Sequence, residues 1–354
     1  MTQSAANGLA NPASGRTDPD ASAVSIGISA SPGAGDTGTR GKRVLIKEAE
    51  TLLLTDPDGA NRRKIAENVS AAAFSPDANL VAYADKQGVH VLSLLDGQSV
   101  SLAEVAEAPV DSVEWSPDQK HVAFDVIGRK SWDLFLASYP PAGDAPRNLG
   151  PWYESISFSP NGIFIVHPSF DPTGSPGPPD FLETVNVETG KRETIYKGAT
   201  TIWVAKYAPD GSSIAFTMTD PNDNLSENDS GGSVCDLWIL HLDSKKAEKI
   251  MPGVFDFDWS PDGRFLAIGT GTDVGDYPPD DGAVFISSAD GKDQFRLSKN
   301  APSLGAIFSP DSKEVMFKDF YGSGLVVGDL ATRKLIPLTG FGPGGVQYVV
   351  YDWK

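Results

Sequence analysis

Apolar and polar residues alternate along residues 255–259, which read Phe-Asp-Phe-Asp-Trp. A period of two residues is typical of a β-strand, because successive side chains point to opposite faces. The next four residues, Ser-Pro-Asp-Gly, favour a tight turn, since proline presets φ, aspartate accepts backbone N–H groups and glycine adopts a left-handed φ. A more continuously apolar run follows at 265–268. The pattern therefore predicts a β-hairpin over residues 255–268.

This hairpin recurs along the chain. Its turn follows an aromatic residue in six copies, at Phe74, Trp115, Phe158, Tyr207, Trp259 and Phe308. Successive aromatic positions are 41, 43, 49, 52 and 49 residues apart, a spacing typical of four-stranded propeller blades. The sequence therefore predicts an all-β chain that forms a single β-propeller. Because Ala78, Gln119 and Ser312 replace the turn glycine, we expect strained or bulged turns there.

A second hairpin follows each of the first. The second hairpins lie at Val89 to Leu102, Leu134 to Leu149, Val185 to Ile195, Leu237 to Ile250, Val284 to Leu297 and Leu325 to Leu338. A seventh copy, residues 52–65, precedes Phe74, and residues 345–353 read as one strand without a partner. If that last strand joins the first three, at 43–47, 52–55 and 62–66, the ring closes as seven four-stranded blades with an N- and C-terminal clasp. A clasp removes exposed sheet edges. The alternative is a six-bladed ring with a loose N-terminal hairpin.

The aromatic-Ser-Pro-Asp-Gly turn, the apolar strand after it and the later Asp-Gly hairpin resemble TolB-type propeller repeats, which are relatives of WD-repeat blades. The resemblance covers Arg43 to Lys354. This repeat family includes periplasmic scaffolds, accessory domains of serine peptidases and some sugar lyases, so the resemblance implies a fold and leaves the function open. TolB itself resembles a six-bladed ring with a separate N-terminal α/β domain. Nothing here matches that domain, so its specific role does not carry over.

Residues 1–42 differ from the repeats in composition. Small and polar residues dominate, so this segment cannot bury enough apolar surface to fold, and we predict a disordered polar tether before a propeller at 43–354. No basic start followed by an apolar run is evident, and no stretch is long enough to span a membrane. The tether resembles the linker of an exported or lipid-anchored protein. We therefore predict an extracytoplasmic location, with the cytoplasm as the alternative.

The chain is acidic, with a formal net charge of −18 at pH 7. The tether contains equal numbers of basic and acidic residues, so the negative charge belongs to the repeats. A surface of this sign repels phosphate backbones and anionic lipid head groups, which argues against nucleic-acid and membrane-surface partners. With a single cysteine, Cys235, the chain forms no internal disulfide.

Three long insertions, at 168–180, 219–232 and 270–282, interrupt neighbouring repeats between the second and third strands. Loops of this length are uncommon unless they are functional or disordered, and all three are predicted to leave the same face of the ring. The predicted binding residues on or near this face are Trp152, Tyr153, His167, Phe170, Asp171, Tyr277, Phe320, Tyr321 and Arg129. Exposed aromatic rings beside charged groups suit a sugar or a peptide segment, whereas packing between blades is the structural alternative.

The acidic insertions also contain a candidate Ca²⁺ site. Its oxygen ligands are Asp220, Asn222, Asp223, Asp273, Asp276 and Asp280. Such hard ligands suit calcium, but the segment lacks the glycine and the distal glutamate of an EF-hand loop. The sequence thus leaves two expectations for cofactors, none or Ca²⁺.

Catalytic motifs are weak. No Gly-x-Ser-x-Gly pentad occurs, and the four histidines fall on different repeats. The leading hypothesis is a non-enzymatic propeller that binds a protein or glycan partner through the long-loop face. The alternatives are a calcium-dependent carbohydrate lyase or hydrolase at the channel mouth and a structural module of a larger assembly. The oligomeric state stays open.

Overall fold

The structure is a computed structural model that describes residues 42–105, 109–128, 132–152, 155–170, 178–219, 235–271, 282–298, 305–319, 324–338 and 348–354. Throughout these ranges the regular elements are β-strands, and no helix is present. None of the described segments forms a helix that is long and apolar enough to cross a membrane. The prediction of an all-β fold is therefore confirmed.

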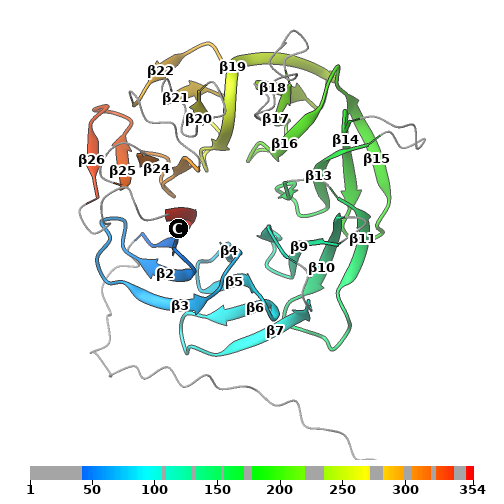
Figure 1. Ribbon diagram of the computed structural model, residues 1–354. Helices are drawn as coiled ribbons and strands as arrows, with labels where there is room; N and C mark the ends of the chain where they lie inside the picture. Colours follow the sequence, from blue (N-terminus) through cyan, green and yellow to red (C-terminus); the bar gives the residue numbers. More distant parts are fainter. Residues whose placement is uncertain are drawn as a thin grey trace, which may run out of the picture.

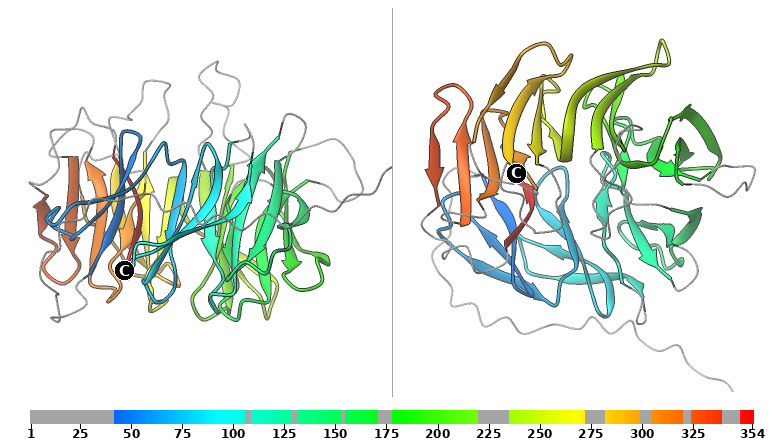
Figure 2. Two further views of the ribbon diagram at one scale, coloured as in Figure 1. Left: turned by 90° about the horizontal axis from the view of Figure 1, so that it is seen from below. Right: turned by 45° about the horizontal axis from the view of Figure 1, so that its top comes forward.

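The strands form antiparallel sheets that stand side by side around a common axis (Figure 1), and they run from one face of the ring to the other (Figure 2). Two sheets at the start of the chain are β27 (Tyr348–Trp353), β1 (Val44–Glu48), β2 (Thr51–Thr55), β3 (Arg63–Glu67); and β4 (Ala71–Phe74), β5 (Leu80–Asp85), β6 (Gly88–Ser93), β7 (Ser99–Glu104). Two further sheets are β8 (Val113–Trp115), β9 (His121–Ile127), β10 (Trp132–Ser138), β11 (Arg147–Pro151); and β12 (Ser157–Phe158), β13 (Phe164–Ser169), β14 (Phe181–Asn186), β15 (Arg192–Lys197).

The remaining described strands form one seven-stranded and one four-stranded sheet. The larger contains β16 (Ile202–Tyr207), β17 (Ser213–Thr219), β18 (Cys235–His241), β19 (Lys246–Trp259), β20 (Phe265–Thr270), β21 (Ala283–Ser288) and β22 (Gln294–Arg296). The smaller contains β23 (Ile307–Phe308), β24 (Glu314–Asp319), β25 (Gly324–Asp329) and β26 (Leu335–Pro337). Strand β19 joins two four-stranded units, since its first part pairs with β18 and its last part with β20.

The two ends of the repeat region lie in one sheet. Strand β27 pairs antiparallel with β1, with Trp353 opposite Val44, and the Lys354 amide donates to the carbonyl oxygen of Arg43 at 2.9 Å. Next to this pairing, the Lys42 ammonium contacts Asp311 at 3.2 Å and Glu314 at 2.8 Å. These contacts join the first described residues to both the last strand and the sheet that precedes it.

The repeated turns share one hydrogen-bond pattern. In the turn at 260–263, the Ser260 hydroxyl donates to Asp262 and accepts the Phe265 amide, and the same bridge forms in four other copies. The last turn residue takes a left-handed φ whether or not it is glycine: 57° at Ala78, 60° at Gln119 and 57° at Ser312. The predicted strain at these three positions is confirmed, because a Cβ atom disfavours this region by about 1 kcal/mol.

The apolar core lies between neighbouring sheets. One cluster, for example, packs Val166 of β13 against Ile214 and Phe216 of β17. Each sheet thus buries both faces against its neighbours, while its innermost strand borders the axis (Figure 1).

Candidate functional site

Charged side chains gather where the innermost strands border the axis. The aromatic residue before each turn is mostly buried, as Trp115, Trp259 and Phe308 show, and the residue before it therefore lies on the other side of its strand. At this preceding position the innermost strands carry Ala73, Glu114, Ser157, Lys206, Asp258, Ile307 and Asp352. The four charged residues at this position lie near two further charged residues, Asp256 and Lys354. We call these six residues the axial cluster: Glu114, Lys206, Asp256, Asp258, Asp352 and Lys354.

Lys206 links two innermost strands of the axial cluster. Its ammonium donates to the carbonyl oxygen of Phe257 at 2.8 Å and lies 3.3 Å from a carboxylate oxygen of Asp258. Burial acts to lower the pKa of Lys206, but the charges of Asp258 and Asp256 outweigh it and leave that pKa raised. Lys206 is therefore a cation whose charge is already paired within the ring.

Two more carboxylates of the axial cluster hold neighbouring sheets together. Asp352 on β27 accepts the backbone amide of Phe74 on β4 at 3.0 Å. Asp256 on β19 accepts the amide of Gly305, just before β23, at 2.9 Å. The backbone N–H groups at the end of β4 and just before β23 are thus satisfied by side chains of the preceding unit. Both aspartates have a structural role in ring packing.

Glu114 differs from the other carboxylates of the cluster. Among the described residues its carboxylate has no hydrogen-bond or ion-pair partner, although the side chain is open to water. Desolvation of the carboxylate inside the ring, together with the nearby charge of Asp352, raises the pKa of Glu114 to about 7, while Lys354 and Lys206 oppose the shift. Glu114 is therefore an accessible carboxyl group that changes charge near neutral pH.

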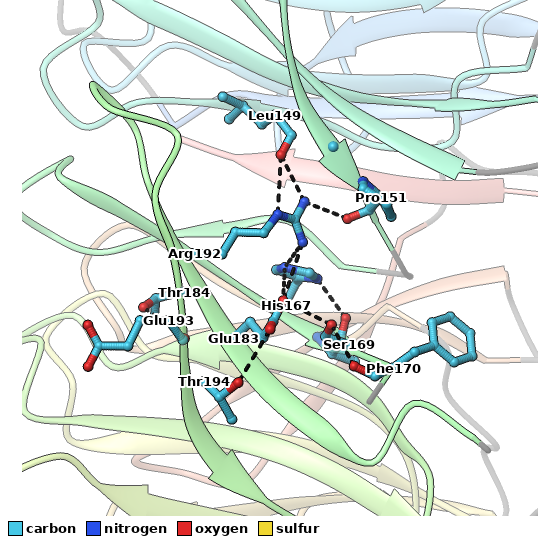
Figure 3. A network of polar contacts seen from close by, with 12 residues as sticks. Leu149, Pro151, His167, Ser169, Phe170, Glu183, Thr184, Arg192, Glu193 and Thr194 are labelled. Atoms are coloured by element: carbon cyan, nitrogen blue, oxygen red, sulfur yellow. Dashed lines mark hydrogen bonds and ion pairs between the residues drawn. The ribbon is translucent and has the colours of Figure 1, made fainter. Parts of the chain in front are cut away.

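A second polar group lies between two sheets (Figure 3). His167, Glu183 and Thr194 pair across β13, β14 and β15, so they lie on one face of that sheet. Glu183 accepts hydrogen bonds from Ser169 at 2.9 Å and Thr194 at 3.3 Å, and it lies 3.4 Å from the guanidinium of Arg192. We call these five residues the His167 network.

Arg192 connects the His167 network to the preceding sheet. Its guanidinium donates to the carbonyl oxygen of Leu149 at 2.9 Å and of Pro151 at 2.6 Å, both on β11 (Figure 3). A planar guanidinium can satisfy several acceptors at once. This side chain therefore joins the outer strand of one sheet to the core of the next.

The imidazole of His167 is neutral and sealed from water. Only 1% of the residue is exposed, and burial, together with the charge of Arg192, lowers the pKa of His167 to about 3. Its Nδ1 lies 2.6 Å from the carbonyl oxygen of Pro168 and its Nε2 lies 3.2 Å from Arg192. A carbonyl oxygen only accepts and a guanidinium only donates, so Nδ1 carries the proton.

The structure separates the predicted binding residues. Trp152, with 3% of its surface exposed, stacks on His167 at 4.1 Å between ring centroids, so our expectation of an exposed ring at Trp152 is wrong. Trp152 and His167 therefore fit the structural alternative, packing between blades, because their rings stack on each other. Phe170 is 48% exposed and stays a predicted binding residue. The other predicted binding residues lie outside the described part of the chain: Tyr153, Asp171, Tyr277, Phe320, Tyr321 and Arg129.

The predicted Ca²⁺ ligands all lie outside the described residues as well. They are Asp220, Asn222, Asp223, Asp273, Asp276 and Asp280. Within the ranges that the structure describes, no three histidine, cysteine or acidic residues are placed to hold a metal ion.

Sequence reasoning missed the axial cluster. The signal was present, because aligning the repeats on their turn aromatic places Glu114, Lys206 and Asp258 at one position. The last strand ends in Asp352-Trp353, which matches Asp258-Trp259. The prediction was based on loop length and therefore omitted this position, which lies inside a strand.

Comparison with known proteins gives structural similarity at low sequence identity. No family model matches the chain, and no curated protein is similar to it in sequence. TolB from Acinetobacter baumannii superposes with a TM-score of 0.52 at 16% identity. The match covers 72% of this chain and only 62% of the length of that protein. The putative TolB from Agrobacterium tumefaciens gives a TM-score of 0.51 at 18% identity, covering 78% of this chain and 96% of that one.

This chain has a TolB-type β-propeller fold. Oligogalacturonate lyase from Vibrio parahaemolyticus shares the architecture, with a TM-score of 0.57 at 14% identity over 83% of this chain and 85% of that protein. Hydrazine synthase from Kuenenia stuttgartiensis also superposes, with a TM-score of 0.55 at 15% identity over 86% and 90% of the two chains. At such identities the likeness establishes the TolB-type fold, and function has to be argued from the site.

Proposed function

We propose that this TolB-type propeller is a non-enzymatic binding protein, whose protein partner presents a positively charged side chain to Glu114 at the axis. The observation that carries the proposal is the contrast within the axial cluster. Asp256, Asp258 and Asp352 each bind a group of the ring, whereas Glu114 has no partner in the described part of the chain. A carboxylate that is accessible yet unpaired beside the axis is suited to an incoming cation.

The partner would approach from the face on which the long connections begin. Strands β13, β17 and β20 end at Ser169, Thr219 and Thr270, and each is the second strand of its unit, so the predicted insertions at 168–180, 219–232 and 270–282 leave the same face. Phe170, exposed beside the first of these ends, supplies apolar contact area there. A glycan partner stays an alternative, but a neutral sugar offers Glu114 no charge.

The architecture proposed for this function is a ring of seven blades closed by a terminal clasp. The pairing of β27 with β1 and the division of β19 between two units support that count over six blades. Residues 1–42 are proposed to tether the ring, and an extracytoplasmic location is proposed from the same polar composition. Deletion of 348–354 is expected to lower stability severely, because β1 becomes an exposed edge.

The test of the binding proposal is the substitution Glu114→Gln in the full-length chain. Removing one charge-assisted contact is expected to weaken the partner's binding about tenfold. The matched control is Glu193→Gln, an exposed carboxylate on the outer strand β15, which should leave binding unchanged. Capture from cell extract with each form, followed by titration with the identified partner, measures the effect. Equal binding by Glu114→Gln and by the unmodified chain would remove Glu114 from the site.

The second candidate function is a calcium-dependent lyase or hydrolase that acts on carbohydrate. Two observations favour it: the pKa of Glu114 near 7 suits a group that exchanges protons at neutral pH, and oligogalacturonate lyases share the fold. Incubation with oligogalacturonate and Ca²⁺ separates the hypotheses, because a lyase produces unsaturated ends that absorb ultraviolet light. Turnover that disappears in Glu114→Gln would replace the binding proposal. If neither a partner nor turnover is found, a structural module of a larger assembly remains.

A further inference from the structure

A cleft of about 680 Å³ opens on the ring face opposite to the long connections. It lies between the sheet of β8–β11 and the sheet of β12–β15, and the turns of both units border it. Its volume falls within the range of small-ligand sites. The axial cluster and the His167 network contribute none of its lining residues.

The cleft has a local cause in the sequence. The connection from β10 to β11 runs from residue 139 to 146, whereas the matching connections in adjacent units are shorter, 94–98 and 187–191. Tyr139 anchors the start of this longer connection: its ring meets Trp115 edge-on at 5.2 Å, and its amide donates to Lys120 at 2.7 Å. At the other end, the Arg147 guanidinium donates to the carbonyl oxygen of Glu188 at 2.5 Å in the next sheet. The connection is therefore held at both ends and borders the cleft between the two sheets.

The floor and lip of the cleft are apolar. Leu136 and Val187 are buried in the core cluster between the two sheets, and each also lines the cleft. Ile163, which also lines the cleft, is 47% exposed. Ile163 is therefore the exposed apolar side chain of the cleft, and the largely covered Leu136 and Val187 complete its apolar lining.

Charges of both signs surround this patch. Lys120 and Arg147 supply positive charge, and Asp144 and Glu188 supply exposed carboxylates. Burial lowers the pKa of His121, which lies among them; Asp118 opposes this shift, whereas Arg147 and Lys120 add to it, and the net lowering favours the neutral imidazole. Within the described residues its ring has no hydrogen-bond partner. The lining therefore offers donors, acceptors and both charges around an apolar centre.

We propose that this cleft binds a short peptide that has an apolar side chain between a positive and a negative charge. The apolar side chain would cover Ile163, Leu136 and Val187. The peptide's carboxylate would contact Lys120 and Arg147, and its ammonium group would contact the carboxylates of Asp144 and Glu188. A purely anionic ligand suits the cleft less well, because acidic side chains outnumber the basic ones in its lining. This inference is independent of the function proposed for Glu114.

The test uses the tripeptide Ala-Leu-Ala with free termini, added to the full-length chain labelled at isoleucine, leucine and valine methyl groups. Methyl resonances of Ile163, Leu136 and Val187 are expected to shift and to saturate together. The same peptide with an acetylated N-terminus and an amidated C-terminus is expected to bind about tenfold more weakly, because both end charges are lost. No shift, or equal binding of the two peptides, overturns the proposal.

Two pairs of variants sharpen the test. Lys120→Gln is expected to weaken tripeptide binding about fivefold, the effect of one exposed charge pair. Lys313→Gln is its matched control, because Lys313 occupies the same turn position in another unit and pairs with Asp311 as Lys120 pairs with Asp118. Ile163→Ser should abolish saturable binding, whereas Ile336→Ser, an exposed isoleucine outside the cleft, should not. Equal effects within either pair would show nonspecific association and overturn the proposal.

Discussion

The axial cluster and the His167 network both gather charged and polar groups inside the ring, yet they satisfy them differently. In the His167 network, Glu183 and the imidazole are almost completely buried, and each has partners in the protein. In the axial cluster, Glu114 is open to water and unpartnered among the described residues. The two regions also shift pKa values in opposite directions, downward at His167 and upward at Glu114.

This difference supports a structural role for the His167 network and the binding role proposed for Glu114. Removing a partner from a sealed, satisfied network leaves other buried groups unpaired, which costs stability. Removing a side chain that binds nothing inside the ring leaves no group unsatisfied. We therefore expect the His167 network to determine stability and Glu114 to determine binding.

The largest effect is expected for Arg192→Leu. This change leaves the carbonyl oxygens of Leu149 and Pro151 without their Arg192 donor and removes the positive charge beside Glu183, and it should lower the free energy of unfolding by about 3 kcal/mol. Urea denaturation measures the loss. Arg264→Leu is the control, because Arg264 forms an exposed ion pair and its loss should cost at most about 0.5 kcal/mol. Equal losses in the two variants would contradict a special role of the network.

A comparable effect, spread over several pH units, is expected from acid. The pKa of His167 is about 3 in the folded protein and 6.5 when the group is unperturbed, so between these values the unfolded chain binds a proton that the folded chain does not. Stability should therefore fall as pH decreases from 6.5 to 3, by up to about 1.4 kcal/mol per pH unit from this residue. Denaturation of the unmodified chain and of His167→Gln across this range tests it. Parallel pH dependences would assign the acid sensitivity to other groups.

The smallest effect, of opposite sign, is expected at Glu114. Its pKa is about 7 in the folded protein against 4.5 unperturbed, so the folded state holds the proton more tightly in this window. Stability should decline as pH rises from 4.5 to 7, and Glu114→Gln should remove the decline. The effect is small because water screens an accessible carboxyl group. Melting temperatures at pH 5 and 8 report it. A large loss of stability in Glu114→Gln would instead make Glu114 structural and erase the contrast with the His167 network.

The sequence predicted the hairpins because their information is local. Serine, proline and aspartate within a turn determine its hydrogen bonds, and even the non-glycine exceptions at Ala78, Gln119 and Ser312 were foreseen as strained. Burial at Trp152 is not local, since its partner His167 lies in the next sheet, so composition alone could not show that this ring is covered. Glu114 was readable from the repeat alignment, but its lack of a partner required coordinates.

Strand β19 continues without interruption from the outer edge of one unit to the inner edge of the next (Figure 1). A loop at such a junction can act as a hinge, whereas this continuous strand resists bending because its first part is hydrogen-bonded to β18 and its last part to β20. Amide protons along residues 246–259 should therefore exchange with solvent as one cooperative unit, and the two units that share this strand should open together.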